Sequence, residues 1–255
     1  MADWLHWLPV GVFLAVALAE GWRPRRGTGR IALGRWATNA LLFFGGIGLV
    51  RLVQWAAGAA AGSALGPSPL AGLMPAGVAA PAWLGVAAGV VALDAMQYGL
   101  HRAFHVAGPW RLHALHHSDV ALDASTAVRH HPLEALAATL AVAGAVWLLA
   151  IPLAALASYG VFALSWAIAT HADVDWRGDQ PGGRLARWLI TPRLHAVHHS
   201  IDPAQAGANY GTVLAVWDRL FGTWRDVAAP AQVGLPASEL PTVLGRERAR
   251  ELQRL

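Results

Sequence analysis

Apolar residues follow one another along this chain in stretches long enough to cross a lipid bilayer. One runs from Trp4 to Ala19 and a second from Ile31 to Val50. A third runs from Ala82 to Leu100, and from Ala135 to Thr170 there are 36 residues without a charge, with Pro152 near their middle. At about 20 residues for each crossing, that last stretch is long enough for two antiparallel helices. The pattern predicts an all-α, polytopic membrane helical bundle with about four to five transmembrane helices.

Arginines between these stretches predict the orientation of the bundle. Four of them follow the first stretch within one short loop: Arg23, Arg25, Arg26 and Arg30. Such loops face the cytoplasm, which puts the ends of the first, third and fifth stretches on the cytoplasmic side. The segment before Ala19 carries Asp3 and no arginine or lysine, which favours a membrane helix over a signal peptide. Arg35 and Arg51 lie near the ends of the second stretch, where long side chains reach the lipid headgroups.

The same pattern predicts a single integral membrane domain over residues 1–255. A connection rich in glycine, proline and alanine, residues 58–81, carries no charge. The candidate functional region covers about residues 94–224, and the polar part after the fifth stretch is predicted to form a cytosolic helical cap. Residues 225–255 are a polar C-terminal tail, in which 246–254 are predicted to form a short solvated helix.

Composition narrows the class of protein. Hydrophobic residues make up 56% of the chain and charged residues 13%, compared with roughly 45 to 50% and 25% in soluble domains. Neither a soluble nor a disordered protein fits these values. The absence of cysteine excludes disulfides, thiolate-ligated haem and cysteine-bound zinc or iron-sulfur sites. The net charge of +4 is small and scattered, so we expect no nucleic-acid partner.

Twelve histidines are unusual in a chain so poor in other polar groups. His101 and His105 are four residues apart, which places both rings on one face of a helix. The segments 111–118 and 193–200 repeat almost letter for letter, each with three histidines at positions i, i+3 and i+4: His113, His116 and His117, then His195, His198 and His199. Two such copies rarely arise by chance. Thr191 followed by Pro192 predicts that the second copy begins a helix.

Eight imidazoles close together predict metal ions. They cannot all be charged, and as neutral rings without partners they leave many nitrogens unsatisfied. Neutral imidazole suits iron, zinc, copper and nickel, and one structural zinc needs only four ligands, so eight histidines imply two metals. The two repeated motifs suggest a pseudo-symmetric pair of metal-binding halves. Redox chemistry on iron is the economical interpretation beside a membrane, because zinc hydrolysis does not require so many nitrogen ligands.

The order HxxxH, seven residues, HxxHH, 77 residues, HxxHH resembles the eight-histidine signature of the fatty acid hydroxylase and sterol desaturase superfamily of membrane di-iron oxygenases. The resemblance covers roughly Asp94 to Trp224, about half of the chain. Further segments that look like family motifs are 117–119, 129–134, 209–211 and 217–223.

The resemblance implies a ligand set and supporting residues. The metal ligands it implies are His101, His105, His113, His116, His117, His195, His198 and His199, with His131 and His171 as additions. His130 is interpreted as a neighbour and His6 as too remote. Because a metal-bound imidazole usually donates its other N–H to an acceptor, nearby polar groups are expected to support the ligands. The candidates are Asp94, Tyr98, Asp119, Asp123, Glu134, Asp173, Asp202, Asn209 and Asp218.

The function implied by the resemblance is hydroxylation or desaturation of a sterol or fatty acyl C–H bond. Two iron ions and O2 perform it, although zinc can occupy such sites in purified protein. Electrons come from a separate reductase, ferredoxin or cytochrome, since the chain shows no nucleotide or haem motif. The expected location is the bacterial inner membrane, with the metal site on the cytoplasmic face.

Three alternatives remain open. The first is pterin-dependent cleavage of ether lipids, as in alkylglycerol monooxygenase, whose motifs are similar. The second is a non-enzymatic histidine-rich membrane protein for metal transport or storage, although transporters place their ligands at mid-membrane, whereas these lie at helix ends. The third is a zinc-stabilised structural relative that has lost catalysis.

Overall fold

The computed structural model describes residues 5, 7–26, 33–61, 81–106, 108–236 and 239. His6, Arg30, most of the 58–81 connection and the predicted helix at 246–254 lie outside the described residues.

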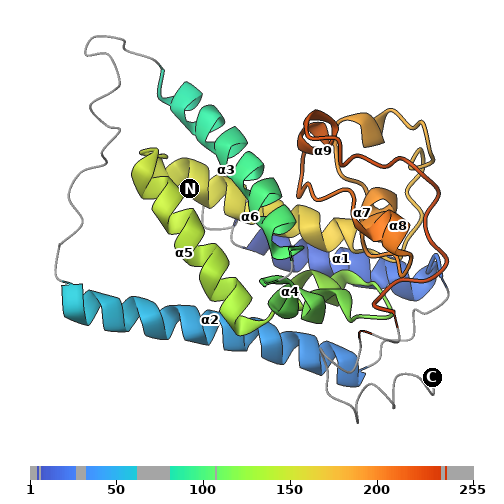
Figure 1. Ribbon diagram of the computed structural model, residues 1–255, viewed down its shortest axis with the longest axis horizontal. Coiled ribbons are helices and arrows are strands. Elements are labelled where there is room, and N and C mark those ends of the chain that lie inside the picture. Colours follow the sequence, from blue (N-terminus) through green and yellow to red (C-terminus); the bar gives the residue numbers. More distant parts are fainter. Residues whose placement is uncertain are drawn as a thin grey trace.

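Five apolar helices form the bundle, as the sequence predicts (Figure 1). They are α1 (Leu8–Trp22), α2 (Leu33–Ala61), α3 (Ala82–Phe104), α5 (Pro132–Leu148) and α6 (Leu153–Thr170). Residues Leu33–Ala57 of α2, together with α3 and α6, are long and apolar enough to cross a membrane. The remaining two, α1 and α5, are shorter apolar helices. The prediction of an all-α membrane bundle is confirmed.

The long uncharged stretch divides into α5 and α6 at the predicted proline. Helix α5 ends at Leu148, and Ala150 then adopts a left-handed conformation with φ 51°. A left-handed residue just past a helix end turns the chain and stops the helix. Pro152 is the N-cap of α6, so the chain begins the next helix directly after this turn.

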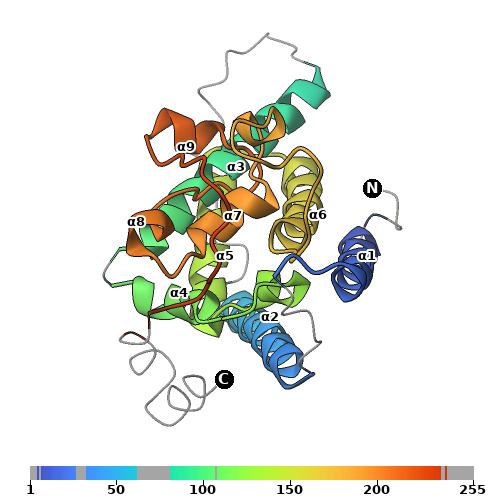
Figure 2. The same cartoon turned by 90° about the vertical axis from the view of Figure 1, so that its right-hand side faces the viewer.

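Small side chains let the helices approach each other closely. In the end-on view of Figure 2, α1 lies beside α6 and α2 beside α5. Gly89 of α3 faces α6 so closely that a Cβ at this position would lie 2.7 Å from the Cβ of Ala155. The core around this crossing contains Leu93, Tyr159 and Ala163. The contact between α3 and α6 therefore depends on the absence of a side chain at one position.

Arg35 lies at the start of α2, as predicted, but its side chain binds the cap instead of facing headgroups, and Arg51 lies further from the end of the helix than predicted. Arg35 binds Asp119 and Asp123, two carboxylates of the cap. Arg51 lies ten residues before Ala61, where α2 ends. The helix is longer than the apolar stretch suggested, because it continues through the uncharged residues after Arg51.

Short helices make up the cap at one end of the bundle. They are α4 (Trp110–His117), η3 (Ala124–Val128), η4 (Leu185–Arg187), α7 (Pro192–His198), α8 (Pro203–Ala206) and α9 (Val216–Leu220). The predicted helix start at Thr191 is confirmed, because its hydroxyl accepts a hydrogen bond from the N–H of Leu194. Arg193 fixes α7 from below. The residue is 1% exposed, and its guanidinium pairs with Asp179 at 3.3 Å and Asp226 at 2.6 Å.

Candidate metal centre

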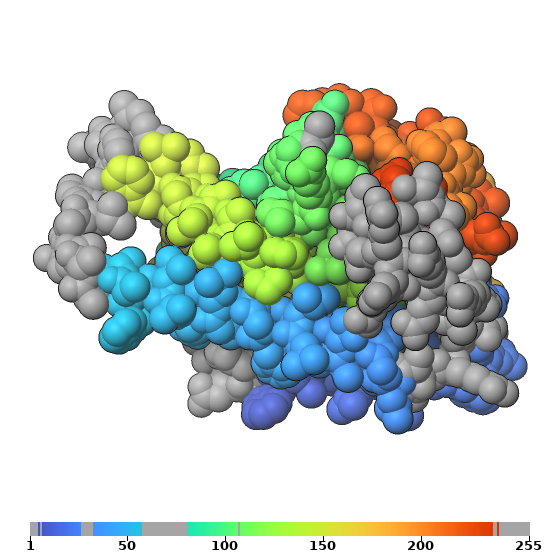
Figure 3. Space-filling model, turned by 60° about the horizontal axis from the view of Figure 1, so that its bottom comes forward, coloured from blue at the N-terminus to red at the C-terminus, as the bar shows by residue number. Residues whose placement is uncertain are grey.

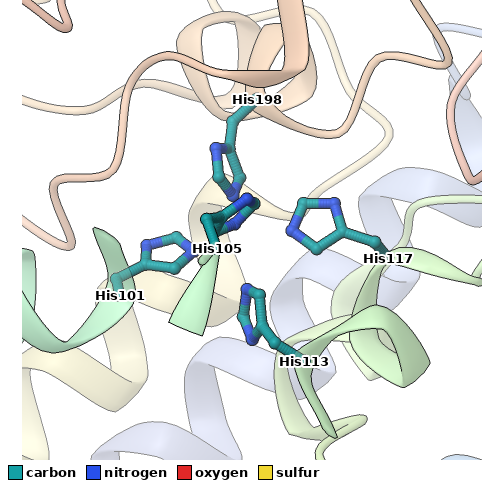
Figure 4. A group of neighbouring side chains, drawn as sticks. All are labelled: His101, His105, His113, His117 and His198. Carbon is teal, nitrogen blue, oxygen red and sulfur yellow. The ribbon is translucent and has the colours of Figure 1, made fainter. Parts of the chain in front are cut away.

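Nine of the ten predicted ligands gather into two groups. The first histidine group consists of His101, His105, His113, His117 and His198, and the second of His116, His171, His195 and His199. Within each group, one ring nitrogen from every member lies within 4.8 Å of the others. Figure 4 shows the rings of the first group pointing toward one another. Helix α3, its C-cap, α4, α7 and the residue after α6 contribute these side chains.

The two repeated motifs contribute to both groups rather than one each. In α4, His113 and His117 join the first group while His116 joins the second. In the second motif the assignment is exchanged: His195 and His199, at i and i+4, join the second group, and His198, at i+3, joins the first. The two motifs are thus related by the pseudo-symmetry that the repeat suggested, but each motif contributes to both groups. Positions i+3 and i+4 differ by about 100° around a helix, so adjacent histidines point to different groups.

Several of the rings have their Nδ1 atom held by an acceptor. His101 and His198 contact the carbonyl oxygens of Tyr210 and Ala208, each at 2.8 Å. His171 contacts the carbonyl of Ala167 at 2.7 Å. A carbonyl can only accept, so each Nδ1 must carry the proton. The Nε2 of these rings is then a free lone pair, which is the form that binds metals.

The loop before α9 places two of those carbonyls. Asp218 accepts from the backbone N–H groups of Tyr210 and Gly211 at 2.7 and 2.8 Å. Asn209 has φ 57°, donates to the carbonyls of Leu194 and Arg225, and accepts from the N–H of Arg225. All the polar atoms of the Asn209 side chain are therefore used to hold the loop, and its supporting role is exerted through the backbone.

The donor atoms fit metal ions. In the first group all five Nε2 atoms are buried and lack a hydrogen-bond partner among the described residues. In the second, His116 and His171 both have Nδ1 against a carbonyl, at 3.3 and 2.7 Å, and their Nε2 atoms face each other at 3.3 Å. Lone pairs facing each other in a buried site are costly unless a cation lies between them.

Burial keeps these rings neutral. Desolvation lowers the pKa of His113, and it lowers the pKa of His116, His117 and the three histidines of 195–199 well below the ordinary value. The pKa of His171 falls to about 4 for the same reason. Neighbouring imidazoles lower most of these pKa values further. The site therefore presents unprotonated imidazoles at neutral pH, as metal binding requires.

Glu134, in the first turn of α5, accepts a hydrogen bond from His113 Nδ1 at 2.8 Å. The same oxygen contacts His130 Nδ1 at 2.9 Å. The other histidine of this segment, His131, is not in either group. Its Nδ1 instead accepts from the N–H of Leu133 and caps α5. Glu134 therefore lies beside a candidate ligand, as the sequence motif predicted. The second histidine that it contacts is His130 and not His131.

Asp94 was predicted to support a histidine, but its carboxylate binds other groups. Its carboxylate accepts from the hydroxyl of Tyr159 at 2.9 Å and from the indole N–H of Trp217 at 2.8 Å. It also accepts from the backbone N–H of Leu214 at 3.2 Å. Because its partners lie on α6, on α9 and in the loop before α9, Asp94 ties the cap to the bundle.

The other predicted acids also bind parts of the chain that shape the cap. Asp119 and Asp123 receive Arg35, Asp173 receives Arg26 at 2.8 Å, and Asp202 caps α8. The Tyr98 hydroxyl lies 3.0 Å from Thr223 Oγ1. These groups satisfy arginines and backbone N–H groups near the site, and sequence spacing cannot tell that role from direct support of a ligand.

A cavity of about 740 Å³ reaches from the histidines into the bundle. Its wall includes members of both groups: His101, His113, His116, His171 and His195. Apolar side chains of α2, α3, α5 and α6 line much of the rest, among them Phe43, Leu93, Met96, Val142, Leu156 and Leu164. The volume is within the range of small-molecule sites, and the lining suits an alkyl chain.

Fold and site together define a membrane helical bundle with two groups of histidines, each of which could hold a metal ion, beside an apolar cavity. The chain belongs to the fatty acid hydroxylase family, whose model matches residues 86–223, more than half of its length.

Curated relatives are lipid-modifying enzymes by name. Ornithine lipid hydroxylase OlsE of Rhizobium tropici is 33% identical over 150 residues, which cover 57% of this chain and 44% of that protein. Alkylglycerol monooxygenase of Caenorhabditis elegans is 35% identical over 133 residues, covering 51% and 25%. The human alkylglycerol monooxygenase is 31% identical over 139 residues, covering 52% and 28%. The chain thus matches less than half the length of these relatives. No solved structure shows significant similarity.

Proposed function

We propose that this protein is a membrane-bound di-iron oxygenase that hydroxylates or desaturates a lipid C–H bond. The observation that carries the proposal is the pair of histidine groups at the wall of an apolar cavity, with Nε2 atoms that lack a partner in the first group and mostly face one another in the second. The names of the relatives support a lipid substrate and oxygen chemistry. Each group would hold one iron, and the two irons would supply the oxidation of an unactivated C–H bond by O2, which no side chain can perform.

The chain's own residues have three tasks in this reaction. The carbonyls of Tyr210 and Ala208 and the Glu134 carboxylate hold ligand rings in the required tautomer. The cavity wall orients an alkyl chain, and its apolar side chains exclude water. The electrons come from a separate protein, a reductase, ferredoxin or cytochrome, that docks on the cytoplasmic cap. We place the protein in the bacterial inner membrane.

Metal analysis of anaerobically purified protein tests the proposal. We expect about two irons per chain, one for each histidine group. Reduction followed by exposure to O2 with a lipid extract should give a product 16 Da heavier or 2 Da lighter than a lipid of the extract. Metal content far below two, together with no lipid product in the presence of a working reductant, would contradict the proposal.

Two variants make a matched comparison. His105→Ala removes a half-buried member of the first group and should lower both iron content and product. His131→Asn lies outside both groups and keeps a side chain able to cap α5, so it should leave both unchanged. Equal losses in the two variants would show that the groups are not the iron ligands.

Cleavage of an ether lipid is a second candidate, favoured by the similarity to alkylglycerol monooxygenases. Incubation of the reduced protein with an alkylglycerol, with and without tetrahydropterin, distinguishes the candidates. Release of a fatty aldehyde that depends on the pterin would favour ether cleavage. Oxidation of an acyl chain or headgroup without the pterin would favour the first proposal.

A further inference from the structure

Arg51 is a cationic residue in the wall of the cavity, and it lies within a helix long enough to span a membrane. Arg51 lies in the Leu33–Ala57 segment of α2 that is apolar enough to cross a membrane, and its side chain both lines the cavity and is exposed. A charge inside such a segment is costly, so it is expected to serve a function or to have a partner of opposite charge.

No partner of opposite charge is found for Arg51 within the described part of the chain. Its recorded contact is with the neutral Gln54, 3.5 Å away and also in the cavity wall. The other arginine of α2, Arg35, binds two carboxylates. The difference matters because a guanidinium in an apolar setting needs an anion as its partner. An anion in the cavity can reach Arg51.

The histidines and Arg51 lie at separated parts of the same cavity. Arg35 at the start of α2 binds the cap, so the helix leads away from the cap toward its C-terminus. A Cβ at Gly46 would lie 3.2 Å from the Cβ of Ala135, the residue after Glu134, so α2 passes close to the start of α5 here, and Arg51 is five residues further along. At 1.5 Å per residue this is about 7.5 Å deeper in the bundle. Figure 3 shows α2 and α5 side by side, parting toward the C-terminal end of α2.

We propose that Arg51 binds the anionic group of the lipid substrate, a carboxylate or a phosphate, while the C–H bond to be oxidised lies at the histidines. The proposal rests on the proposed function for the identity of the histidine end. The guanidinium can form two parallel hydrogen bonds to either anion, and Gln54 can add a third. The apolar wall between Arg51 and the histidines would then hold the part of the lipid that joins the two ends, so Arg51 would select which carbon is presented.

Lipid binding by the purified protein tests this inference without O2 or a reductant. The probes are two matched pairs: palmitate against hexadecanol, and dioleoyl phosphatidic acid against dioleoylglycerol. We expect the wild type to bind the anionic member of at least one pair more tightly, and Arg51→Gln to lose on the order of tenfold of that preference. The pair that responds identifies the anion as a carboxylate or a phosphate.

Arg23→Gln is the matched control, because Arg23 is an exposed arginine at the end of α1 and outside the cavity. It should keep the preference of the wild type. Arg51→Lys keeps the charge but loses the two-pronged geometry, so its preference should fall between wild type and Arg51→Gln, and it serves if Arg51→Gln fails to fold. Preferences unchanged in both Arg51 variants, or a wild type without preference in either pair, would overturn the inference.

The outcome for Arg51 is separate from that for catalysis. Arg51-dependent binding with no oxidised product would leave this inference standing and remove the proposed function. Oxidation of a lipid at the same carbon and with the same efficiency in Arg51→Gln would support the proposed function and overturn this inference.

Discussion

Backbone carbonyls, more often than acidic side chains, hold the Nδ1 atoms of the gathered histidines. Among the described contacts, carbonyls accept from four of them: His101, His116, His171 and His198. A carboxylate takes this place for His113, through Glu134. A sequence does not show where a backbone carbonyl points. Acidic side chains were therefore predicted as acceptors at places where the loop backbone accepts the hydrogen bond. The ligand types could be predicted from spacing, but most of their acceptors could not.

Removing the charge of Glu134 should weaken the first histidine group. In Glu134→Gln the carboxylate that accepts from His113 becomes a neutral amide, which reduces the basicity of the ring. Loss of such support typically costs about 10 to 100-fold in metal affinity or activity. The iron content that remains after dialysis against a weak chelator measures this loss of metal affinity. Asp94→Asn is the control: its contacts are with Tyr159, Trp217 and Leu214, so it should lower thermal stability but not iron affinity. The reverse result would restore Asp94 as the supporting acid.

Acid should destabilise the metal-free protein. Burial lowers the pKa of His171 to about 4, whereas in the unfolded chain it is near the ordinary value of 6.5. Between these values the unfolded chain takes up a proton that the folded chain does not, so stability is present above about pH 6.5 and is lost as the pH falls toward 4. The remaining gathered histidines outside the spanning segments shift in the same direction.

Thermal unfolding of chelator-treated protein between pH 7.5 and 5 measures this effect. We expect the melting temperature to decrease steadily below pH 6.5. A melting temperature that stays constant over this range would show that the rings are solvated and titrate normally, which disagrees with the buried site.

Among the helices, the hydrophobic pattern predicted more than the histidine pattern did. The five apolar helices, the break at Pro152 and the start of α7 at Thr191 all agree with local signals. Helical spacing also predicted that His101 and His105 lie together, and both belong to the first histidine group. It could not predict that the two motifs contribute to the groups in exchanged order, because that depends on how two helices whose motifs are 77 residues apart pack together.

Helix contact can be tested at two glycines of α3. A Cβ at Gly89 would lie 2.7 Å from Ala155 Cβ and 3.0 Å from Ile151 Cγ2, so α3 and α6 must separate in Gly89→Ala. Overpacking of this kind costs about 1 to 3 kcal/mol. Gly99→Ala meets no atom within 4 Å, and alanine favours a helix by up to about 1 kcal/mol. Melting temperatures in detergent should therefore fall for the first variant and stay level or rise for the second. Equal changes in both would mean that α3 and α6 are not in close contact.

At the scale of the whole molecule, the histidine groups, the cap and the cavity form one connected unit at one end of the bundle. Helix α3 brings His101 and His105 to that end, α5 begins there with Glu134, and α6 ends there before His171. The sequence predicted this common end from the count of crossings. The cavity that connects it with Arg51 was not predictable, since it depends on how α2 and α5 diverge along their length.

The sequence predicts five crossings, which would put the cap and the histidines on the same side as the arginine-rich loop, and the positive-inside rule assigns that loop to the cytoplasm. Arg25 and Arg26 of that loop bind Asp175 and Asp173 of the cap at 2.5 and 2.8 Å, so loop and cap cannot lie on opposite sides of a membrane. A fluorescent reporter that matures only in the cytoplasm should therefore be bright when fused after Leu255. The same reporter inserted between α2 and α3 should be dark, and a phosphatase active only outside the cytoplasm should show the opposite pattern. An external cap would deprive the metal centre of cytoplasmic reductants, so that result would contradict both the topology and the proposed source of electrons.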